Sequence, residues 1–156
     1  MAIEKAKEYL KQFGADGRVL EFEVSSATVE LAAQALSCEP ARIAKSLTFS
    51  GEHPIMVIAA GDAKVDNKKF KEQFSMKAKM LSPEEVDTLI GHSIGGVCPF
   101  GVNEGVEVYL DESMKRFATV FPAAGSSNSA IELTLDELEQ FSRSRQWVDV
   151  CKGWEN

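Results

Sequence analysis

Two apolar runs joined by a short turn constrain the fold of this chain more than any other feature. The first run is Leu47-Thr48-Phe49, and the second extends over Ile55–Ala60. Between them lies the turn sequence Ser50-Gly51-Glu52-His53-Pro54. Apolar strand-forming runs on either side of a turn that contains Gly and Pro are typical of a β-hairpin. We therefore expect two adjacent antiparallel strands in this part of the chain.

Helix signals fall at irregular intervals around the predicted hairpin. Apolar residues recur at helical spacing over residues 3–13, which predicts an amphipathic helix that ends at Gly14. Ser25 or Ser26 is expected to cap a second helix, because a hydroxyl can accept a free N–H of the first turn. Three further helix starts carry capping residues, namely Asp66, Ser82 with Glu85, and Thr134 with Glu137.

The number and length of the strand segments indicate the fold class. Further short strands are expected over residues 19–24, 94–97, 106–110, 117–121, 131–133 and 147–150. Short, mostly hairpin-connected strands with irregularly placed helices favour a mixed α/β fold over a doubly wound one. A chain of 156 residues can bury one core. We expect a single compact domain over residues 1–156, with a curled, barrel-like mixed β-sheet flanked by helices.

Several classes of cofactor are not indicated. The chain has neither a G-x-G-x-x-G turn after a strand nor a G-x-x-x-x-G-K-[ST] loop, so we expect no nucleotide cofactor. Cys38, Cys98 and Cys151 are far apart and lack the spacing of a zinc site, so we expect free thiols and no metal. Without an apolar signal core or a long apolar run, we expect a cytoplasmic protein with no membrane partner.

The charge of the chain is unevenly distributed. Its net charge is −7, yet residues 40–80 hold eight basic and four acidic side chains. Lys68 and Lys69 fall in the first turn of the helix expected after Asp66, where the helix dipole disfavours cations. An anionic ligand would reverse that cost, and a surface turn that tolerates it is the alternative. With Lys64, these two lysines are predicted to contact an RNA backbone, whereas DNA is not an expected partner.

A glycine-rich loop is the first candidate for a ligand site. Its sequence is Gly95-Gly96-Val97-Cys98-Pro99-Phe100-Gly101, and it lies between two apolar segments. Glycines let main-chain N–H groups approach a bound carbonyl or phosphate without interference from a Cβ, and Pro99 fixes the following backbone. A turn at the end of a strand is the alternative reading of this segment.

Lys45 is the second candidate, because it is expected where a short helical turn passes into an apolar strand. An ammonium group at the mouth of a pocket can hold a substrate phosphate or carbonyl opposite main-chain donors. The alternative is a solvated charge at a strand edge, whose aliphatic stem packs while its head reaches water. His53 and His92 both lie next to turn residues, and neither is expected to be catalytic.

Four motifs occur in an order that resembles the YbaK-like family of aminoacyl-tRNA editing domains, which is also called the prolyl-tRNA synthetase-associated domain family. The motifs are Ala44–Leu47, Gly61–Asp66 with Lys69-Phe70, Gly95 to Pro99 with Phe100-Gly101, and Phe121–Ser126 leading to Ile131–Thr134. The resemblance covers most of the chain. It implies a compact α/β domain with a barrel-like mixed sheet, and a free-standing enzyme that hydrolyses the ester between a wrong amino acid and its tRNA.

The resemblance also implies roles for individual residues. Lys45, Gly95 and Gly96 would act in catalysis, with Lys45 fixing the substrate end while main-chain donors hold the ester that a bound water attacks. The positions implied to bind substrate are Ser46, Val97, Cys98, Pro99, Phe100, Gly101, Gly125, Ser126 and Asn128. The implied partner is the acceptor end of an aminoacyl-tRNA, with an aminoacyl-tRNA synthetase as a further partner.

The loop over residues 125–129 falls where related domains place residues that help to select the amino acid. Its small polar residues suit alanine, serine or threonine, and cysteine stays open too, although an ordinary Gly/Ser/Asn turn is the alternative. The family member that removes alanine from prolyl-tRNA has asparagine after its lysine and a histidine in this loop. Here Ser46 follows Lys45 and the loop has no histidine.

Two other functions remain open alongside the deacylase. One is a catalytically silent module that binds tRNA or aminoacyl-adenosine, because family membership alone does not prove chemistry. The other is a thiol-dependent hydrolase built around Cys98, which would need a neighbouring histidine and a third orienting group.

Overall fold

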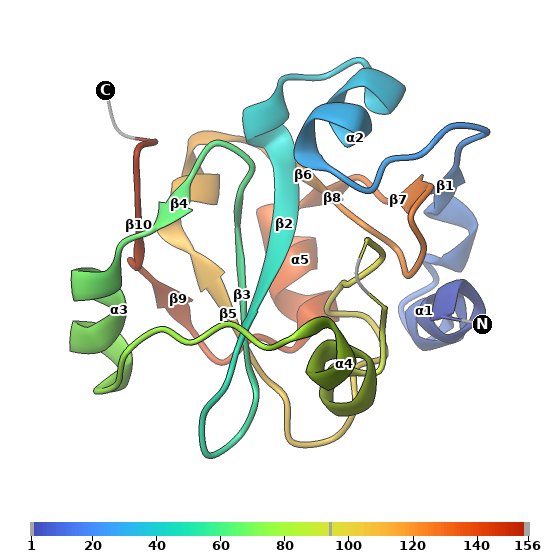
Figure 1. Cartoon of the computed structure of the whole chain (residues 1–156). Helices are drawn as coiled ribbons and strands as arrows, with labels where there is room; N and C mark the ends of the chain where they lie inside the picture. Colours follow the sequence, from blue (N-terminus) through green and yellow to red (C-terminus); the bar gives the residue numbers. More distant parts are fainter. Residues whose placement is uncertain (1, 94, 155–156) are drawn as a thin grey trace.

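The computed structural model describes residues 2–93 and 95–154, and a six-stranded mixed sheet lies at its centre (Figure 1). The strand order is β8-β6-β2-β3-β5-β9. The bounds are β2 (Ile43–Phe49), β3 (Ile55–Ala60), β5 (Glu107–Asp111), β6 (Thr119–Pro122), β8 (Leu133–Thr134) and β9 (Trp147–Val148). The sheet curls into a half-barrel with helices packed around it. The prediction of a single mixed α/β domain with a curled sheet is therefore confirmed.

The predicted hairpin forms the middle of this sheet. Strands β2 and β3 pair antiparallel, with Lys45 opposite Ala59 and Ser46 opposite Ile58. Strand β3 is buried along its whole length, because β2 and β5 cover both of its edges and its side chains enter the core. Strand β2 starts at Ile43, so Lys45 lies inside the strand and not at its junction with the preceding turn.

Two short ribbons complete the strands. Strand β1 (Leu20–Glu21) pairs antiparallel with β7 (Ser129–Ala130), and β4 (Lys64–Val65) pairs antiparallel with β10 (Cys151–Lys152). Each ribbon joins segments that are far apart in the sequence. The first ties the loop after residue 125 to the N-terminal part of the chain, and the second ties the C-terminal part to the segment that precedes α3.

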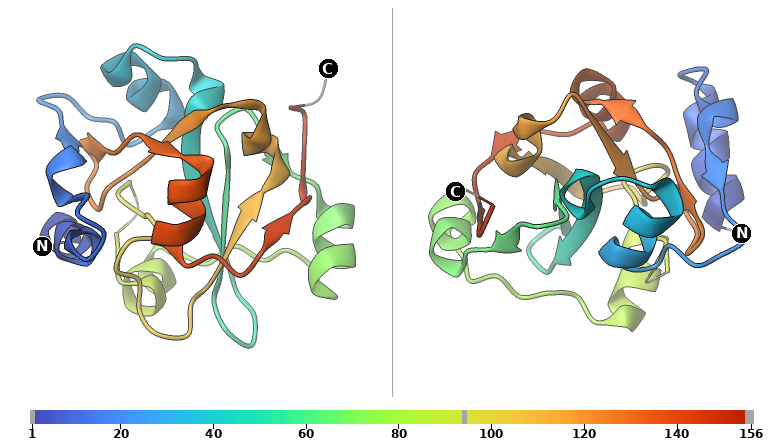
Figure 2. Two further views of the ribbon diagram at one scale, coloured as in Figure 1. Left: turned by 180° about the vertical axis from the view of Figure 1, so that it is seen from behind. Right: turned by 90° about the horizontal axis from the view of Figure 1, so that it is seen from above.

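The helices surround the sheet on several sides. Their bounds are α1 (Ala2–Lys11), α2 (Val29–Leu36), α3 (Asn67–Phe74), α4 (Pro83–Glu85, continued by a π-helical turn over Val86–Ile90) and α5 (Leu135–Ser142). Short 3-10 turns are η1 (Asp16–Arg18), η2 (Pro40–Arg42) and η4 (Glu112–Arg116). Helix α5 covers the face of the sheet that is turned toward the viewer in the left panel of Figure 2. Helices α1 and α3 lie at opposite ends of the molecule in all views.

The capping residues explain where most helices start. Asp66 accepts the N–H groups of Lys68 and Lys69, and the predicted capping boxes start α4 and α5. The cap predicted for the second helix is wrong, because Thr28 accepts the N–H of Leu31 at 3.1 Å. Ser26 instead donates its hydroxyl to the carbonyl of Ser127, which holds two loops together.

Some predicted strands are absent or shorter. Ile94 lies outside the described residues, and residues 95–97 form no strand, because they belong to a loop in which Gly95 has a φ of +96°. The segment 19–24 contributes the two residues of β1. In the ranges 2–93 and 95–154, no helix is long and apolar enough to cross a membrane.

Candidate functional site

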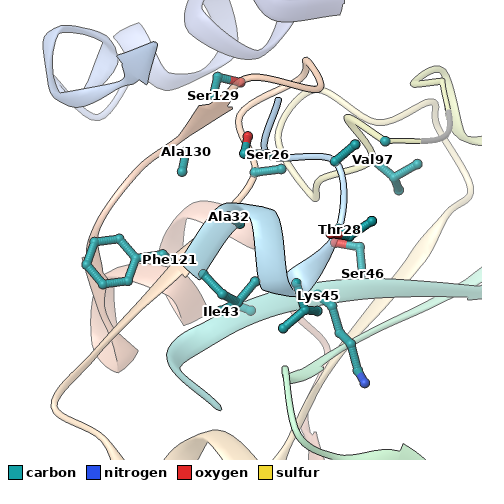
Figure 3. A pocket seen from close by; sticks show the side chains of 15 residues that line it. Ser26, Thr28, Ala32, Ile43, Lys45, Ser46, Val97, Phe121, Ser129 and Ala130 are labelled. Atoms are coloured by element: carbon teal, nitrogen blue, oxygen red, sulfur yellow. The ribbon is translucent and has the colours of Figure 1, made fainter. Parts of the chain in front are cut away.

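A pocket of about 240 Å³ opens between the start of α2, the beginning of β2 and the two glycine loops (Figure 3). Its floor comes from neighbouring parallel strands, since Ile43 of β2 lies opposite Phe121 of β6. The Arg42 guanidinium lies over the Phe121 ring, 5.0 Å from its centroid, and fixes that ring. Four hydroxyl side chains line an otherwise largely apolar wall, namely Ser26, Thr28, Ser46 and Ser129.

Lys45 lines this pocket, but its ammonium group is directed away from the labelled hydroxyls (Figure 3). The Nζ atom donates to the carbonyl of Gly61 at 3.3 Å and to the carbonyl of Ala63. An ammonium has three N–H donors, so these two contacts leave one donor for a ligand. Burial lowers the pKa of Lys45, because the charged form loses water that the two carbonyls replace only in part.

The turn that receives the Lys45 ammonium is held by contacts on two sides. Asp62 forms a bidentate ion pair with Arg116, with distances of 2.6 and 2.9 Å, and this pair lowers the pKa of Asp62. Gly61 is packed so tightly that a Cβ would lie 2.1 Å from the carbonyl oxygen of Pro40. The position of Lys45 thus depends on a turn with little freedom to move.

The two predicted ligand loops meet at the pocket. Gly95 and Val97 line it, and Gly96 packs directly on the other loop. A Cβ on Gly96 would lie 2.8 Å from both the N and Cα atoms of Ser126, so only glycine allows this approach. The main-chain N–H of Gly96 donates to Ser93 at 3.0 Å. Val97 lines the pocket, and its N–H has no hydrogen-bond partner within the described part of the chain.

The rest of the first loop turns away from the pocket. Cys98, Pro99 and Phe100 are buried, and Gly101 packs against the backbone of Lys5. His92 closes the base of the loop by donating from Nε2 to the carbonyl of Phe100 at 2.8 Å, in the tautomer that carries a proton there. These residues shape the loop, and the structure does not bring them to the pocket wall.

Cys98 has surroundings that oppose nucleophilic chemistry. Its Sγ atom lies 3.7 Å from His92 Nε2, but both side chains are buried in the core. Burial raises the pKa of Cys98 to about 12 and lowers that of His92. A thiol with so high a pKa is almost entirely protonated at neutral pH.

The second loop is organised by its own hydroxyl and amide groups. The Ser126 hydroxyl lies 2.7 Å from that of Ser129 and 2.9 Å from the amide oxygen of Asn128. Asn128 donates its amide to the carbonyl of Phe22 at 2.8 Å. Of these residues Ser129 reaches the pocket, whereas Gly125, Ser126 and Asn128 support the wall from behind.

Ser46 is a distinctive polar group in the pocket. Its Oγ atom is buried and has no hydrogen-bond partner among the residues described. A buried hydroxyl without a partner is costly, and a ligand in the pocket could satisfy it. Among the described residues that line the pocket, Lys45 is the only side chain that titrates.

Several residues of the pocket were not predicted from the sequence. Ser26, Thr28, Phe121 and Ser129 come from segments that the sheet and the β1–β7 ribbon bring together. The Ser-Ala-Thr segment before α2 has the hydroxyl groups of a helix cap, and the same segment also lines the pocket. Phe121 begins the fourth motif and Ser129 ends the loop over residues 125–129, yet neither was predicted to line a pocket.

The three lysines predicted to bind RNA lie away from the pocket. Lys64 is exposed on β4, and Lys68 is exposed in the first turn of α3. Lys69 points elsewhere, with Nζ 3.0 Å from an Asp149 carboxylate oxygen and 3.0 Å from the carbonyl of Cys151. The free N–H groups at the start of α3 are partly used by Asp66, which weakens the case for an anion at the helix end itself.

Comparison with known proteins finds a matching family model, related sequences and similar solved structures. The model of the aminoacyl-tRNA editing domain matches residues 23–141. The uncharacterized protein YwhH of Bacillus subtilis (strain 168) is 56% identical over 157 residues, which cover 99% of this chain and 100% of YwhH. A crystal structure of a candidate trans-editing enzyme for prolyl tRNA synthetase has a TM-score of 0.88 and 30% identity, covering 97% of this chain and 98% of the other.

Longer relatives contain a similar segment. The proline–tRNA ligase of Thermotoga neapolitana is 33% identical over 125 residues, which are 79% of this chain and 21% of the ligase. This chain therefore matches about a fifth of the length of that ligase.

Proposed function

Because this chain belongs to the aminoacyl-tRNA editing domain family, we propose that it is a deacylase that hydrolyses the ester of mischarged tRNA in trans. The proposal takes residues 1–156 as one editing domain that acts without being part of a synthetase chain. The similarity to a candidate trans-editing enzyme over nearly the whole of both chains supports this arrangement.

One observation carries the proposal from family to site. Lys45 with Ser46, the loop at Gly95, and the loop that ends at Ser129 come from three distant parts of the sequence and line one pocket. Two of them are in backbone contact at Gly96 and Ser126. A pocket built from a lysine, hydroxyl groups and main-chain donors suits an ester substrate. Segments that served only as surface turns would not need to meet in one pocket.

The proposed mechanism uses these groups. A water molecule attacks the ester carbonyl carbon, and the developing oxyanion is held by main-chain N–H groups such as that of Val97. Donors aimed at such an oxyanion are worth on the order of 3 kcal/mol each. The ester C–O bond then breaks, the ribose oxygen takes a proton, and the free amino acid and tRNA leave. A ribose hydroxyl of the substrate can relay the proton, because Lys45 is the only titratable side chain among the described residues that line the pocket and no side chain there is a ready base.

Lys45 acts in this proposal as a binding group and not as a nucleophile. Two of its donors are engaged by the carbonyls of Gly61 and Ala63, on the side away from the pocket hydroxyls. The third would hold a phosphate or carbonyl oxygen of the part of the substrate that extends beyond the pocket. Burial lowers the pKa of Lys45 from its ordinary value of 10.5.

The size of the pocket favours a small amino acid. A volume of about 240 Å³ is below the range of about 300–1,000 Å³ for common ligand pockets, so the pocket suits an aminoacyl group and leaves the terminal adenosine outside. The hydroxyls and alanines in its wall are compatible with alanine, serine, threonine or cysteine. The proposed partners are the aminoacyl-tRNA acceptor end and, through it, a synthetase.

The direct test is a deacylation panel. We expect the protein to release one or two amino acids from tRNAs charged with alanine, serine, threonine, cysteine and proline. Lys45→Met keeps the aliphatic stem but removes the charge, and we expect it to lose most of the activity. Lys11→Ala is the matched control, because Lys11 is an exposed lysine paired with Glu8 on α1.

The outcomes of the panel distinguish the deacylase from a silent binding module and from a thiol hydrolase. Full activity in Lys45→Met would exclude the proposed role of the lysine. If no substrate is cleaved, but a non-hydrolysable aminoacyl-adenosine amide binds saturably, the chain is a silent binding module. Loss of activity on alkylation of Cys98 alone would favour the thiol hydrolase, which the burial and raised pKa of Cys98 oppose.

A further inference from the structure

Six lysines of this acidic protein have no hydrogen-bond or ion-pair partner for their ammonium groups among the described residues. Every arginine and six other lysines contact a carboxylate, a carbonyl or an amide oxygen, as in the Arg18–Glu137 and Lys7–Glu21 pairs. Five of the six form what we call the lysine face, which consists of Lys64, Lys68, Lys71, Lys77 and Lys152, whereas Lys79 lies near Glu85 of α4.

The five lysines of the lysine face are grouped in space. Lys64 and Lys152 are cross-strand partners in the β4–β10 ribbon. Lys68, Lys71 and Lys77 line one hollow of about 490 Å³ at α3. The ribbon and α3 lie together at one end of the molecule, opposite α1 (Figure 1).

Stability alone does not account for this grouping. Like charges directly opposite each other in a ribbon are destabilising, as at Lys64 and Lys152. A cation in the first turn of a helix, such as Lys68, is also disfavoured. The chain has 24 acidic residues, but Asp66 is engaged by main-chain N–H groups and Asp149 by Lys69. Glu72 is the remaining acidic side chain on α3.

We propose that the lysine face is the surface on which the phosphate backbone of an RNA acceptor stem docks, outside the pocket. The inference rests on the proposed function and deepens it. Positive groups spread over a ribbon, a helix and the following segment match a series of phosphates along a helical backbone, whereas a single small anion would need one convergent site. The assignment leaves out Lys69, whose ammonium group is used inside the protein.

The chain also connects the lysine face to the pocket. The carbonyls of Gly61 and Ala63 hold the Lys45 ammonium, and Lys64 follows directly in the sequence. An RNA strand that leaves the lysine face toward the pocket would pass this turn. Lys45 then lies at the boundary between the part of the substrate that is held by charge and the part that is hydrolysed.

The test compares two charge-reversal variants of the full chain. The face variant carries Lys68→Glu, Lys71→Glu and Lys77→Glu. The control variant carries Lys11→Glu, Lys115→Glu and Arg145→Glu, which change the net charge equally at exposed positions elsewhere. Circular dichroism verifies that both are folded. Binding of an uncharged RNA minihelix with an acceptor-stem sequence is measured by fluorescence anisotropy over a range of salt concentrations.

We expect the face variant to bind the minihelix at least about tenfold more weakly than the native protein at low salt. Its plot of log affinity against log salt should be shallower by about 0.7–0.9 for each phosphate contact that is lost. The control variant should keep the native slope. Equal binding by both variants would overturn the proposal.

A second substrate separates this proposal from the proposed function. An aminoacyl ester of a short CCA trinucleotide reaches the pocket without the stem, so the face variant should cleave it at the native rate. Cleavage of this ester together with unchanged minihelix binding in the face variant would reject the lysine face and leave the deacylase intact. No cleavage by the native protein would instead reject the deacylase. If the face variant binds RNA normally but loses binding to prolyl-tRNA synthetase, the surface docks a protein and the proposal is wrong.

Discussion

Gly96 is the residue at which the two loops of the pocket touch, and the contact leaves no room for a side chain. A Cβ there would lie 2.8 Å from main-chain atoms of Ser126, and a main chain cannot move aside as a flexible side chain can. The loop that carries Val97 is thereby fixed relative to the loop that carries Ser129. A change of one methyl group at this position should therefore move the walls of the pocket apart.

We predict that Gly96→Ala lowers the free energy of unfolding by about 1–3 kcal/mol, the usual cost of overpacking. It should lower deacylation further than this stability loss explains, because the misplaced donors no longer meet the oxyanion. Gly17→Ala is the control, since a Cβ at Gly17 meets nothing within 4 Å. Thermal unfolding and the rate on the best tRNA substrate provide the two readings. A Gly96→Ala protein with native activity would show that the contact does not set the geometry of the site.

At the scale of elements, the turn after β3 supports the position of Lys45. Its two carbonyls receive the Lys45 ammonium, and its side chain Asp62 is held by Arg116 from η4. Arg116 also donates to the carbonyl of Ser113 and lies over the Trp154 ring. The C-terminal segment and η4 thus act on Lys45 through this turn, without contacting the pocket.

We predict that Asp62→Asn weakens substrate binding, because the turn loses its ion pair with Arg116. The charge exchange Asp62→Arg with Arg116→Asp should restore part of the binding that either charge reversal alone removes, with a coupling of about 0.5–3 kcal/mol. The pair stabilises the fold fully above the ordinary Asp pKa of 3.8, and this contribution is lost as the pH falls through the lowered pKa of Asp62. The free energy of unfolding of the Asp62→Asn variant should therefore fall less steeply as the pH is lowered. Glu112→Gln, which removes the exposed Lys115 pair in η4, is the control. Additive effects of Asp62→Arg and Arg116→Asp on substrate binding would contradict the coupling.

Local signals were sufficient for much of the element level. The capping boxes of α4 and α5, the Asp66 cap and the central hairpin were predicted, because each depends on residues that are close together in the sequence. The order of strands was not predictable, since the parallel pairing of β2 with β6 joins residues nearly 80 positions apart. Thr28 replaced Ser25 and Ser26 as the cap because those two serines bond within the loop and to Ser127.

In the candidate site, too, residues with a local signal were predicted and residues brought in by distant pairings were not. Lys45, Ser46, Gly95 and Val97 were predicted and line the pocket, because motif and loop chemistry mark them in the sequence. Residues that the β1–β7 ribbon and the sheet carry to the pocket have no local mark of a ligand role. Conversely, Cys98 to Gly101 belong to the same motif but turn into the core, since His92 closes the base of their loop.

For the whole molecule, the three thiols report on how tightly the domain is closed. Cys98 and Cys151 are buried, and burial raises the pKa of both to about 12. Cys38 is partly exposed next to α2, and burial raises its pKa as well. The core therefore protects two thiols both by excluding the reagent and by keeping them protonated.

We predict that iodoacetamide at pH 8 modifies Cys38 slowly and leaves Cys98 and Cys151 intact in the folded protein. All three thiols should react in guanidinium chloride. Intact mass and peptide mapping distinguish the sites, and Cys38→Ser should remove the native adduct. Rapid modification of Cys98 in protein with a native circular dichroism spectrum would mean that the loop beside it opens readily.

The pocket is assembled from residues that leave the ribosome at very different times. Its first wall, around Ser26 and Lys45, is synthesised long before Ser129 and Ala130, which β7 pairs with β1. Contacts between positions so far apart form late, because the intervening chain must first be ordered. A nascent chain that ends before the second loop therefore carries Lys45 but lacks the wall that Ser129 and Ala130 supply. If the proposed deacylase activity depends on this pocket, an interrupted translation product would lack it and would not compete with the finished protein for substrate.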